Sequence, residues 1–465
     1  MVTKIETDYL IIGGGAAAFA FADIILSETE FSVTVVDRYH QPGGHWNFAY
    51  PFVRLHQPSS GYGVESRELG SGAIDKQGWN EGLQELASTG EILAYYDQLL
   101  HQDFLPTGRF HYYPMCEYTE DGAFSSIVTG EQFQATIRKK LVDSTHQKVV
   151  VPAMRPPQYP VSEGVDCVSP DRIAKLNKGY ENYTVVGAGK TAIDTCLWLM
   201  GQGLSPDRIR WIMPRDSWLI NRIHTQPGPE FQDHYVKYLE AQFAAVMGSD
   251  DADAMFAQLE QAGALLRLDP SVEPTMYRCA TVSEKELQHL RAIKNVVRKG
   301  RVESIERDKI VLEQGSEQFE ASTLFIDCTA DGLEKRPSLP VFDGDLITLQ
   351  SVRPCQQVFS ASLIAHCEAA YSDQAEQNEI CRPVSHPDTH IDWLRVSLET
   401  CRCESLWASK PELRKWLLNS RLNWLWRLGP ELPQDPEALD QSFQMRTAML
   451  QAMGQKFEQI LANYS

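Results

Sequence analysis

The sequence predicts an α/β fold with two parallel sheets. Two stretches repeat the same order of strand, glycine-rich turn, apolar helix and strand, one over residues 8–36 and one from residue 183. Strands joined through a helix pair in parallel, so each stretch predicts the start of its own parallel sheet. A chain of 465 residues also exceeds one compact core.

The first unit has an apolar strand at 8–12, an Ala-rich helix at 16–27 and a β-branched strand at 32–36. The turn GGGAAA fits G-x-G-x-x-A. Its glycines permit a tight turn and close approach of a pyrophosphate, and the small third residue lets the helix pack on the strand. An acidic residue after the second strand is placed to accept from ribose hydroxyls. The predicted dinucleotide contacts here are Gly13, Gly15, Ala16, Ala18, Asp37 and Arg38.

The second unit has a strand at 183–186, the turn GAGKTA, a helix at 193–203 and a strand at 208–213. Gly187, Gly189, Lys190 and Thr191 are its predicted dinucleotide contacts. The last strand leads into Arg215 rather than a carboxylate, with Arg222 nearby as a further candidate. An arginine at this point can pair with a ribose 2′-phosphate, which favours NADPH over NADH. Asp216 follows at once and leaves that preference open.

Hydrophobic periodicity and turn residues divide the chain into domains. We expect a first domain over 1–170, a second over 171–320 with a helical insertion at about 226–295, and a helical segment over 391–465. The family resemblance described below implies that 321–390 returns to the first domain. The elements expected between the two units and beyond them are strands at 110–113 and 149–151, a Pro-rich connector at 152–160, a hairpin at 301–313, a buried strand at 323–328 and a Trp-rich helix at 413–428.

Composition narrows the function. The net charge of −19 makes nucleic acid an unfavourable partner. No apolar run is long enough to cross a bilayer, and the first residues lack a signal-peptide pattern. The ten cysteines are scattered without C-x-x-C, so we expect reduced thiols in a cytoplasmic protein. Cys401 and Cys403 form C-x-C, for which two thiols on a helix outweigh a metal or redox pair.

The pair of glycine motifs resembles that of the flavin-containing and class B flavoprotein monooxygenases, within the two-dinucleotide-binding flavoprotein family. The resemblance covers residues 5–370 and implies two Rossmann-like domains, with FAD in the N-terminal one and NAD(P)H in the inserted one. Residues 43–46 (GGHW) are similar to the family's G-G-x-W, which implies that Gly44 and Trp46 lie along the FAD. The turn at 329–332, with Asp331, resembles the return to the FAD domain. Residues 353–370 resemble the helix that faces the flavin ring.

One departure from the family concerns its F-x-G-x-x-x-H fingerprint, in whose place the chain reads YPVSEGVDCVSPDRI without a histidine. The whole chain more closely resembles bacterial NAD(P)/FAD-dependent oxidoreductases with the strings HQPSxxYG, GAGKTxxD and MPRDSW. The resemblance implies an oxidoreductase that uses NADPH, FAD and O2. It further implies a monooxygenase that acts on a small molecule through a flavin C4a-hydroperoxide.

The loop at 54–63 (RLHQPSSGYG) is the expected catalytic segment, because polar, glycine-rich loops beside a cofactor often carry function. The resembled monooxygenases place an asparagine here, which implies a catalytic role for Gln57, with His56 as the neighbouring candidate. An oxidase or dehydrogenase without oxygen insertion, and a nucleotide-binding redox sensor, remain alternatives. A disulfide reductase is disfavoured because no C-x-x-C or C-x4-C pair is present.

Overall fold

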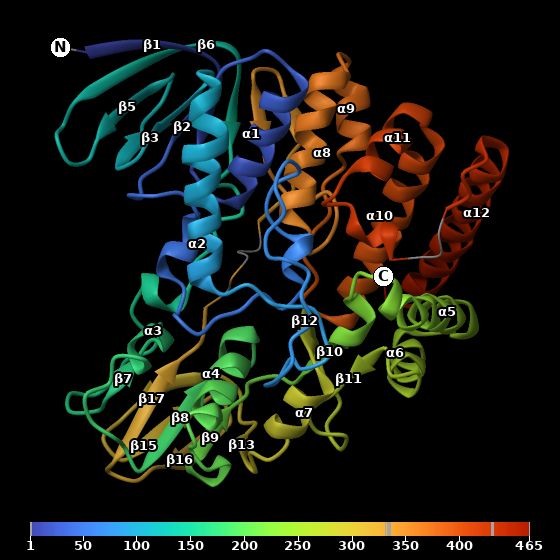
Figure 1. Cartoon of the computed structure of the whole chain (residues 1–465). Coiled ribbons are helices and arrows are strands. Elements are labelled where there is room, and N and C mark those ends of the chain that lie inside the picture. Colours follow the sequence, from blue (N-terminus) through green and yellow to red (C-terminus); the bar gives the residue numbers. More distant parts are fainter. Residues whose placement is uncertain (1, 331, 333–335, 429–431, 465) are drawn as a thin grey trace.

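The computed structural model describes residues 2–330, 332, 336–428 and 432–464. Two α/β units are stacked one above the other at one side of the molecule, and the C-terminal helices lie beside them (Figure 1). The expected α/β class is therefore confirmed. Within the described residues, no helix has the length and apolar character needed to cross a membrane.

The first unit is built on a mixed sheet of eight strands, with β1 at its centre. β1 pairs in parallel with β2 and β6, β2 with β3, and β6 with β19, whereas β4, β5 and β18 add antiparallel pairs. The strands are β1 (Val2–Ile12), β2 (Val33–Val36), β3 (Phe110–Tyr113), β4 (Cys116–Tyr118), β5 (Ala123–Ser126), β6 (Gln132–Asp143), β18 (Phe342–Asp343) and β19 (Leu346–Thr348).

The second unit is a five-stranded, wholly parallel sheet in the order β13-β9-β8-β17-β7. Its strands are β7 (Cys167–Val168), β8 (Asn182–Val186), β9 (Ile209–Ile212), β13 (Asn295–Val297) and β17 (Thr323–Asp327). The inserted arrangement is thus present. β7 and β17 both belong to this sheet, so the chain crosses into the second unit before residue 167 and leaves it after residue 327.

Two small sheets complete the strand structure. β14 (Val302–Ile305), β15 (Lys309–Leu312) and β16 (Gly315–Gln318) form an antiparallel meander, of which the expected hairpin is the first part. β10 (Ser217–Asn221), β11 (Leu265–Leu266) and β12 (Met276–Val282) form the other. The region at 226–295 is therefore only partly helical, because β11 and β12 pair with β10 across a long separation that helical periodicity does not reveal.

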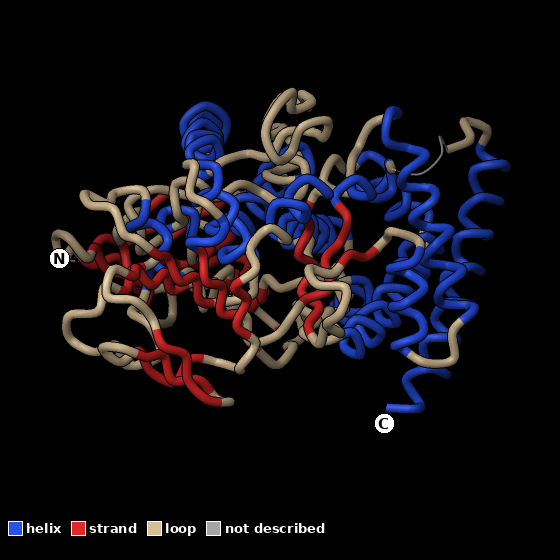
Figure 2. The backbone as a smooth tube through the Cα atoms, turned by 90° about the horizontal axis from the view of Figure 1, so that it is seen from below, coloured by secondary structure: helices blue, strands red, loops and turns tan. Residues whose placement is uncertain are grey.

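Twelve α-helices lie in the described residues. They are α1 (Ala16–Glu28), α2 (Thr89–Gln98), α3 (Pro170–Ile173), α4 (Lys190–Gly201), α5 (Gln232–Gly248), α6 (Ala252–Gln261), α7 (Glu284–Leu290), α8 (Gln357–Ala370), α9 (Gln374–Ile380), α10 (His390–Ser409), α11 (Pro411–Asn419) and α12 (Pro436–Leu461). Seen from below, the strands gather on one side and the C-terminal helices on the other (Figure 2).

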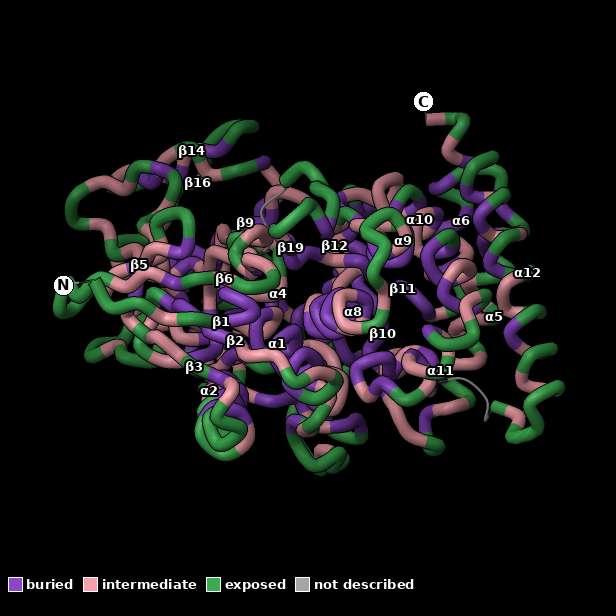
Figure 3. Tube along the Cα trace, turned by 90° about the horizontal axis from the view of Figure 1, so that it is seen from above, coloured by how far each residue is buried: buried purple, intermediate pink, exposed green. Residues whose placement is uncertain are grey.

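The helix α8 lies at the centre of the molecule. Its buried residues share one apolar core with α1, β1 and the start of α11, and Figure 3 shows it as a buried element between the first sheet and the C-terminal helices. A helix that is apolar on nearly all sides must be covered on all sides. In this position, the N-terminus of α8 points toward the second unit.

Two sequence expectations fail. Residues 149–151 form no strand, although they are β-branched, because they lie in the irregular connection between the two sheets. The expected helix over 413–428 is broken: α11 ends at Asn419, and a separate 3-10 turn covers Trp424–Arg427. The break has a local cause, since the Asn423 side chain bonds the carbonyl of Leu417 at 2.8 Å and the Ser420 hydroxyl bonds Glu65 at 2.6 Å.

Candidate functional site

The two glycine turns have matching geometry. Gly13 has φ +91° and Gly187 has φ +126°, a region that residues with a side chain rarely adopt. A methyl group at Gly15 would meet only the Gly44 Cα, 3.9 Å away, and one at Gly189 would meet nothing within 4 Å. Both positions therefore leave open space directly before a helix.

The helices after these turns leave their first N–H groups without side-chain caps. Gly15 directly precedes α1 and Gly189 directly precedes α4, and neither helix has an acidic residue in its first turn. The same is true of α8, which begins after Gln356. Uncapped helix N-termini bind anions, since the backbone N–H groups and the helix dipole both favour negative charge. The residues present thus fit pyrophosphates at α1 and α4.

Asp37 lies at the end of β2, where the sequence predicts it, but its carboxylate faces the protein. It is 2% exposed and accepts hydrogen bonds from the Tyr112 hydroxyl at 3.0 Å and the Tyr39 N–H at 3.2 Å. Burial raises the pKa of this carboxyl group. Arg38 points outward and pairs with exposed Glu117 at 3.4 Å. In this structure neither side chain is directed into open space beside the glycine turn.

The segment GGHW packs directly on the first turn. The Gly43 N–H donates to the Gly14 carbonyl at 2.9 Å, and a methyl group at Gly44 would approach the Gly15 Cα to 3.1 Å. The Trp46 indole N–H donates to the Tyr62 hydroxyl at 2.8 Å and its ring is buried. The segment therefore closes the first turn and links it to the loop that contains Tyr62.

That loop, residues 50–64, bridges the two units. The Tyr50 hydroxyl donates to Asp194 on α4 at 2.8 Å, and Lys190 at the start of α4 bonds both Asp194 and the Arg54 carbonyl, the latter at 3.2 Å. Lys190 is thus occupied by protein groups at the point where the sequence predicts a dinucleotide contact. Thr191 follows it in the first turn of α4.

Within the loop, Gln57 and His56 occupy different surroundings. Gln57 Oε1 accepts from the Gln356 amide at 3.1 Å, and Gln356 Oε1 accepts from the Trp424 indole at 3.1 Å. Gln57 therefore reaches the N-terminus of α8, where the family resemblance implies the flavin ring. His56 Nδ1 is buried and has no hydrogen-bond partner among the described residues.

Arg222 proves to be an interior residue. It is 1% exposed and pairs with Glu286 at 2.7 Å. Its other N–H groups bond the carbonyls of His56 at 3.3 Å and Thr281 at 3.1 Å. Arg222 therefore fixes the backbone of the loop at 50–64, and of the two arginines only Arg215 stays a candidate for the contact with a 2′-phosphate.

Arg215 follows β9 and is about one-third exposed. Its guanidinium contacts both carboxylate oxygens of Asp388 at 2.9–3.1 Å, and Arg278 binds the same carboxylate at 2.7 Å. Asp388 immediately precedes the capped start of α10. The carboxylate occupies a bidentate position on Arg215 of the kind that a phosphate would use. Asp331 lies outside the described residues.

The expectation of ten free thiols is wrong. Cys279 and Cys355 form a disulfide across 76 residues, while eight cysteines are free. No C-x-x-C search could find this pair, because its members come from β12 and from the loop before α8. Cys401 and Cys403 lie buried on α10, and burial raises the pKa of each thiol to about 12, so they are unreactive thiols.

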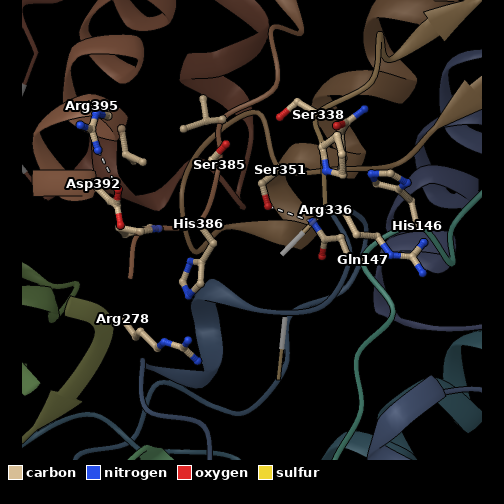
Figure 4. Close-up of a pocket in the computed structure, with 15 residues that line it drawn as sticks. His146, Gln147, Arg278, Arg336, Ser338, Ser351, Ser385, His386, Asp392 and Arg395 are labelled. Atoms are coloured by element: carbon tan, nitrogen blue, oxygen red, sulfur yellow. Dashed lines mark hydrogen bonds and ion pairs between the residues drawn. The ribbon is translucent and has the colours of Figure 1, made fainter. Parts of the chain in front are cut away.

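A cavity of about 400 Å³ opens beside this disulfide. Figure 4 shows Arg278 and His386 on one side, His146 and Arg336 on the other, and the ion pair of Asp392 and Arg395 above. The lining has three arginines, two histidines and one carboxylate. Arg395 pairs with that carboxylate, Asp392, and Arg278 pairs with Asp388. A small molecule with negative charge fits this lining.

No model of a known protein family matches the chain. Over 457 residues it is 50% identical to the uncharacterized protein Rv2000 of Mycobacterium tuberculosis (strain ATCC 25618 / H37Rv), which covers 98% of this chain and 85% of that protein.

Among solved structures, two monooxygenases match this chain over most of its length. Cyclohexanone monooxygenase from Rhodococcus sp. Phi1 bound to NADP+ matches with a TM-score of 0.48 at 13% identity, covering 92% of this chain and 97% of that one. Oxidized steroid monooxygenase bound to NADP matches with a TM-score of 0.49 at 14% identity, covering 78% of this chain and 85% of that one.

Two sheets, one mixed and one wholly parallel, each contain a strand followed by a G-x-G-x-x-A turn and an uncapped helix. This arrangement defines an α/β protein with two dinucleotide-binding-type domains. The identity over nearly the full length identifies the group within that class: the chain belongs to the same family as Rv2000.

The two partly buried histidines of this site, His45 and His56, predict an acid-sensitive fold. Burial lowers the pKa of His45 to about 4, and burial together with Lys190 and Arg222 lowers that of His56 to about 3. The unfolded chain then binds more protons below pH 6.5, so the free energy of unfolding falls as the pH drops toward these values. Each histidine contributes a slope of at most about 1.4 kcal/mol per pH unit.

His56→Gln should flatten that slope between pH 6 and pH 4, as measured by urea unfolding at several pH values. His111→Gln, an exposed position on β3, is the matched control and should leave the slope unchanged. An equal slope in wild type and His56→Gln, at equal flavin content, would contradict the prediction.

Proposed function

We propose that this chain is an FAD-dependent oxidoreductase that is reduced by NADPH and transfers oxygen from O2 to a small molecule. The observation that carries the proposal is the loop at 50–64, whose side chains and backbone bond the start of α4 in one unit and Gln356 before α8 in the other. A segment so placed touches both of the helix N-termini at which the two cofactors would meet.

FAD would be held by the Gly13–Gly15 turn with Gly44, and NADPH by the Gly187–Gly189 turn with Arg215. When bound, the flavin supplies hydride acceptance and the reaction with O2. The chain supplies the surroundings: Gln57 presents an amide fixed by Gln356, and His56 stays neutral near Lys190 and Arg222 because its pKa is depressed. Trp424 and Tyr62 cover this region with aromatic surface, which limits access of water.

The test is single-turnover reduction of the purified holoprotein by NADPH, followed by exposure to O2 with an amine, a thioether and a ketone as acceptors. Oxygenated product in amounts matching the NADPH consumed supports the proposal. Peroxide in matching amounts with every acceptor would instead make the chain an oxidase, and absence of reduction by either nicotinamide cofactor would leave a binding protein.

Substitutions in the two glycine turns should weaken FAD binding and NADPH binding separately. Gly15→Ala has room in the protein and an ordinary φ of −83°, so the fold should survive, whereas the methyl group fills the space that a pyrophosphate needs. Affinity for FAD should fall about tenfold or more. Gly189→Ala should keep the flavin and weaken NADPH binding instead. Flavin absorbance per chain and NADPH titration measure the two effects.

Gly90→Ala, near the start of α2 and also free of contacts, serves as the control and should retain both ligands. Stoichiometric, tightly bound flavin in Gly15→Ala would exclude the first turn as the FAD site.

Arg215 predicts a cofactor preference. A lost charge-assisted contact to a phosphate costs about 1.5–3 kcal/mol, so Arg215→Ala should weaken NADPH binding roughly ten- to a hundredfold and leave NADH nearly unchanged. Arg210→Ala removes an arginine of β9 that bonds the Gln318 carbonyl, and is the matched control. An equal loss for both cofactors in Arg215→Ala and Asp388→Asn would mean that the ion pair between them is purely structural.

Substitution of Gln57 should change the product of the reaction with O2. Gln57→Leu keeps the size of the side chain and removes its hydrogen-bonding groups, one of which is worth on the order of 3 kcal/mol to a developing anion. NADPH should reduce this variant at a nearly normal rate, but peroxide should replace oxygenated product. If His56→Ala forms less oxygenated product per NADPH consumed while Gln57→Leu does not, the catalytic role belongs to His56. If neither variant changes this ratio, the loop has only a structural role.

A further inference from the structure

The Cys279–Cys355 disulfide joins the two units of the fold. Cys279 lies on β12, inside the inserted unit, and Cys355 lies two residues before α8 of the first unit. The next residue, Gln356, bonds Gln57 at 3.1 Å. Making or breaking this bond therefore acts on a segment that the catalytic loop contacts directly.

The backbone at both cysteines is unusual. Cys279 has φ +55° and Cys355 has φ +59°, and only five non-glycine residues in the described part of the chain have a positive φ. At Cys279 the pairing of β12 with β10 is interrupted by a bulge, which redirects the side chain. Non-glycine residues in this region cost free energy and cluster at functional sites, so two of them in one bond indicate a built feature.

The two cysteines also have a histidine and a cavity beside them. His386 Nδ1 lies 3.8 Å from Cys355 Sγ, and ligand-forming atoms of all three residues lie within 4.8 Å of one another. His386 and Arg278, the neighbour of Cys279, both line the cavity of about 400 Å³ (Figure 4). A reagent in that cavity thus meets the residues on either side of the disulfide.

The other cysteines differ from this pair. Seven of the eight free cysteines are buried and Cys167 is half-buried. Burial raises the pKa of Cys196, Cys328 and Cys381, which keeps them as inert thiols. Redox chemistry at cysteine is therefore concentrated at one place in the described chain.

We propose that Cys279, Cys355 and His386 form a reversible dithiol–disulfide centre that exchanges with a low-molecular-weight thiol bearing a carboxylate, taken up in the adjoining cavity. The positive lining of the cavity, in a chain of net charge −19, selects the anionic reagent. This activity is separate from the proposed oxygen transfer and requires no flavin.

The exchange balances in two steps. The thiolate of the reagent attacks Cys279 Sγ, the bond between the two cysteine sulfurs breaks, and Cys355 leaves as a thiolate that takes a proton from His386. A second reagent thiolate then attacks the sulfur of the bound reagent, releasing reagent disulfide, and Cys279 takes up a proton. Two reagent thiols have lost two electrons and two protons, and the protein pair has gained them.

The first experiment counts thiols in the full-length holoprotein purified without reductant. Peptide mapping should show Cys279 linked to Cys355, and equilibration with glutathione buffers should open the link reversibly and expose two thiols to a maleimide under native conditions. A Cys167→Ser background removes the remaining half-buried thiol from the count. Two free thiols at 279 and 355 in air-equilibrated protein, or a link that opens only when the protein unfolds, would overturn the proposal.

The second experiment tests His386 through a pH profile. A cationic or hydrogen-bonding imidazole beside a thiol favours the thiolate, so alkylation of reduced Cys355 should proceed at lower pH than for an ordinary thiol. His386→Gln should raise the apparent pKa of the Cys355 thiol by about one unit, which lowers the rate of its alkylation near pH 7 about tenfold. His390→Gln, on the same segment, is the control. Equal profiles for wild type and His386→Gln would remove His386 from the centre.

The third experiment separates exchange from metal binding and tests the reagent class. Reduction by 3-mercaptopropionate should be at least several-fold faster per thiolate than reduction by uncharged 2-mercaptoethanol, and Arg336→Ala should diminish that preference. An absent preference would overturn the assigned reagent class. Stoichiometric zinc in the purified protein, lost in Cys355→Ser, would make the three residues a metal site and overturn the exchange centre.

Discussion

The candidate site depends on one buried guanidinium. Arg222 connects the carbonyl of His56 in the loop at 50–64, the carbonyl of Thr281 on β12 and the carboxylate of Glu286 on α7. A buried charge is tolerated only when it is paired and its N–H groups are bonded, so these partners must all be in place at once. The same contacts bring the loop, the inserted unit and the segment around Cys279 to one position.

Around that position the structure uses helix N-termini instead of charged side chains. α1, α4 and α8 begin without side-chain caps, whereas α2, α7 and α10 have complete capping boxes. Side chains that sequence patterns assign to cofactors are instead occupied by protein: Asp37 by Tyr112, Lys190 by Asp194 and Arg215 by Asp388. Backbone N–H groups would therefore make the main contacts to phosphates, with Arg215 changing partner if NADPH binds.

The C-terminal segment, which the sequence shows only as rich in Trp and Leu, completes the site from outside the two units. Arg421 donates to the carbonyls of Ser60, Tyr62 and Val64, and Trp424 bonds Gln356. Loop carbonyls without strand partners need such donors when they are buried. The loop at 50–64 is thus held by the C-terminal segment on one side and by Arg222 on the other.

The sequence by itself determined the α/β class and the two glycine turns, because hydrophobic period and turn chemistry are local properties of the chain. The role that the sequence suggests for Gln57 stays a prediction. Only the tertiary structure decided that Arg222 is interior, that β12 interrupts the expected helical insertion, and that Cys279 meets Cys355 and His386. Those outcomes depend on pairings between distant segments, such as β10 with β12 and the loop before α8 with β12. Such pairings follow from how the units pack, and no local pattern encodes them.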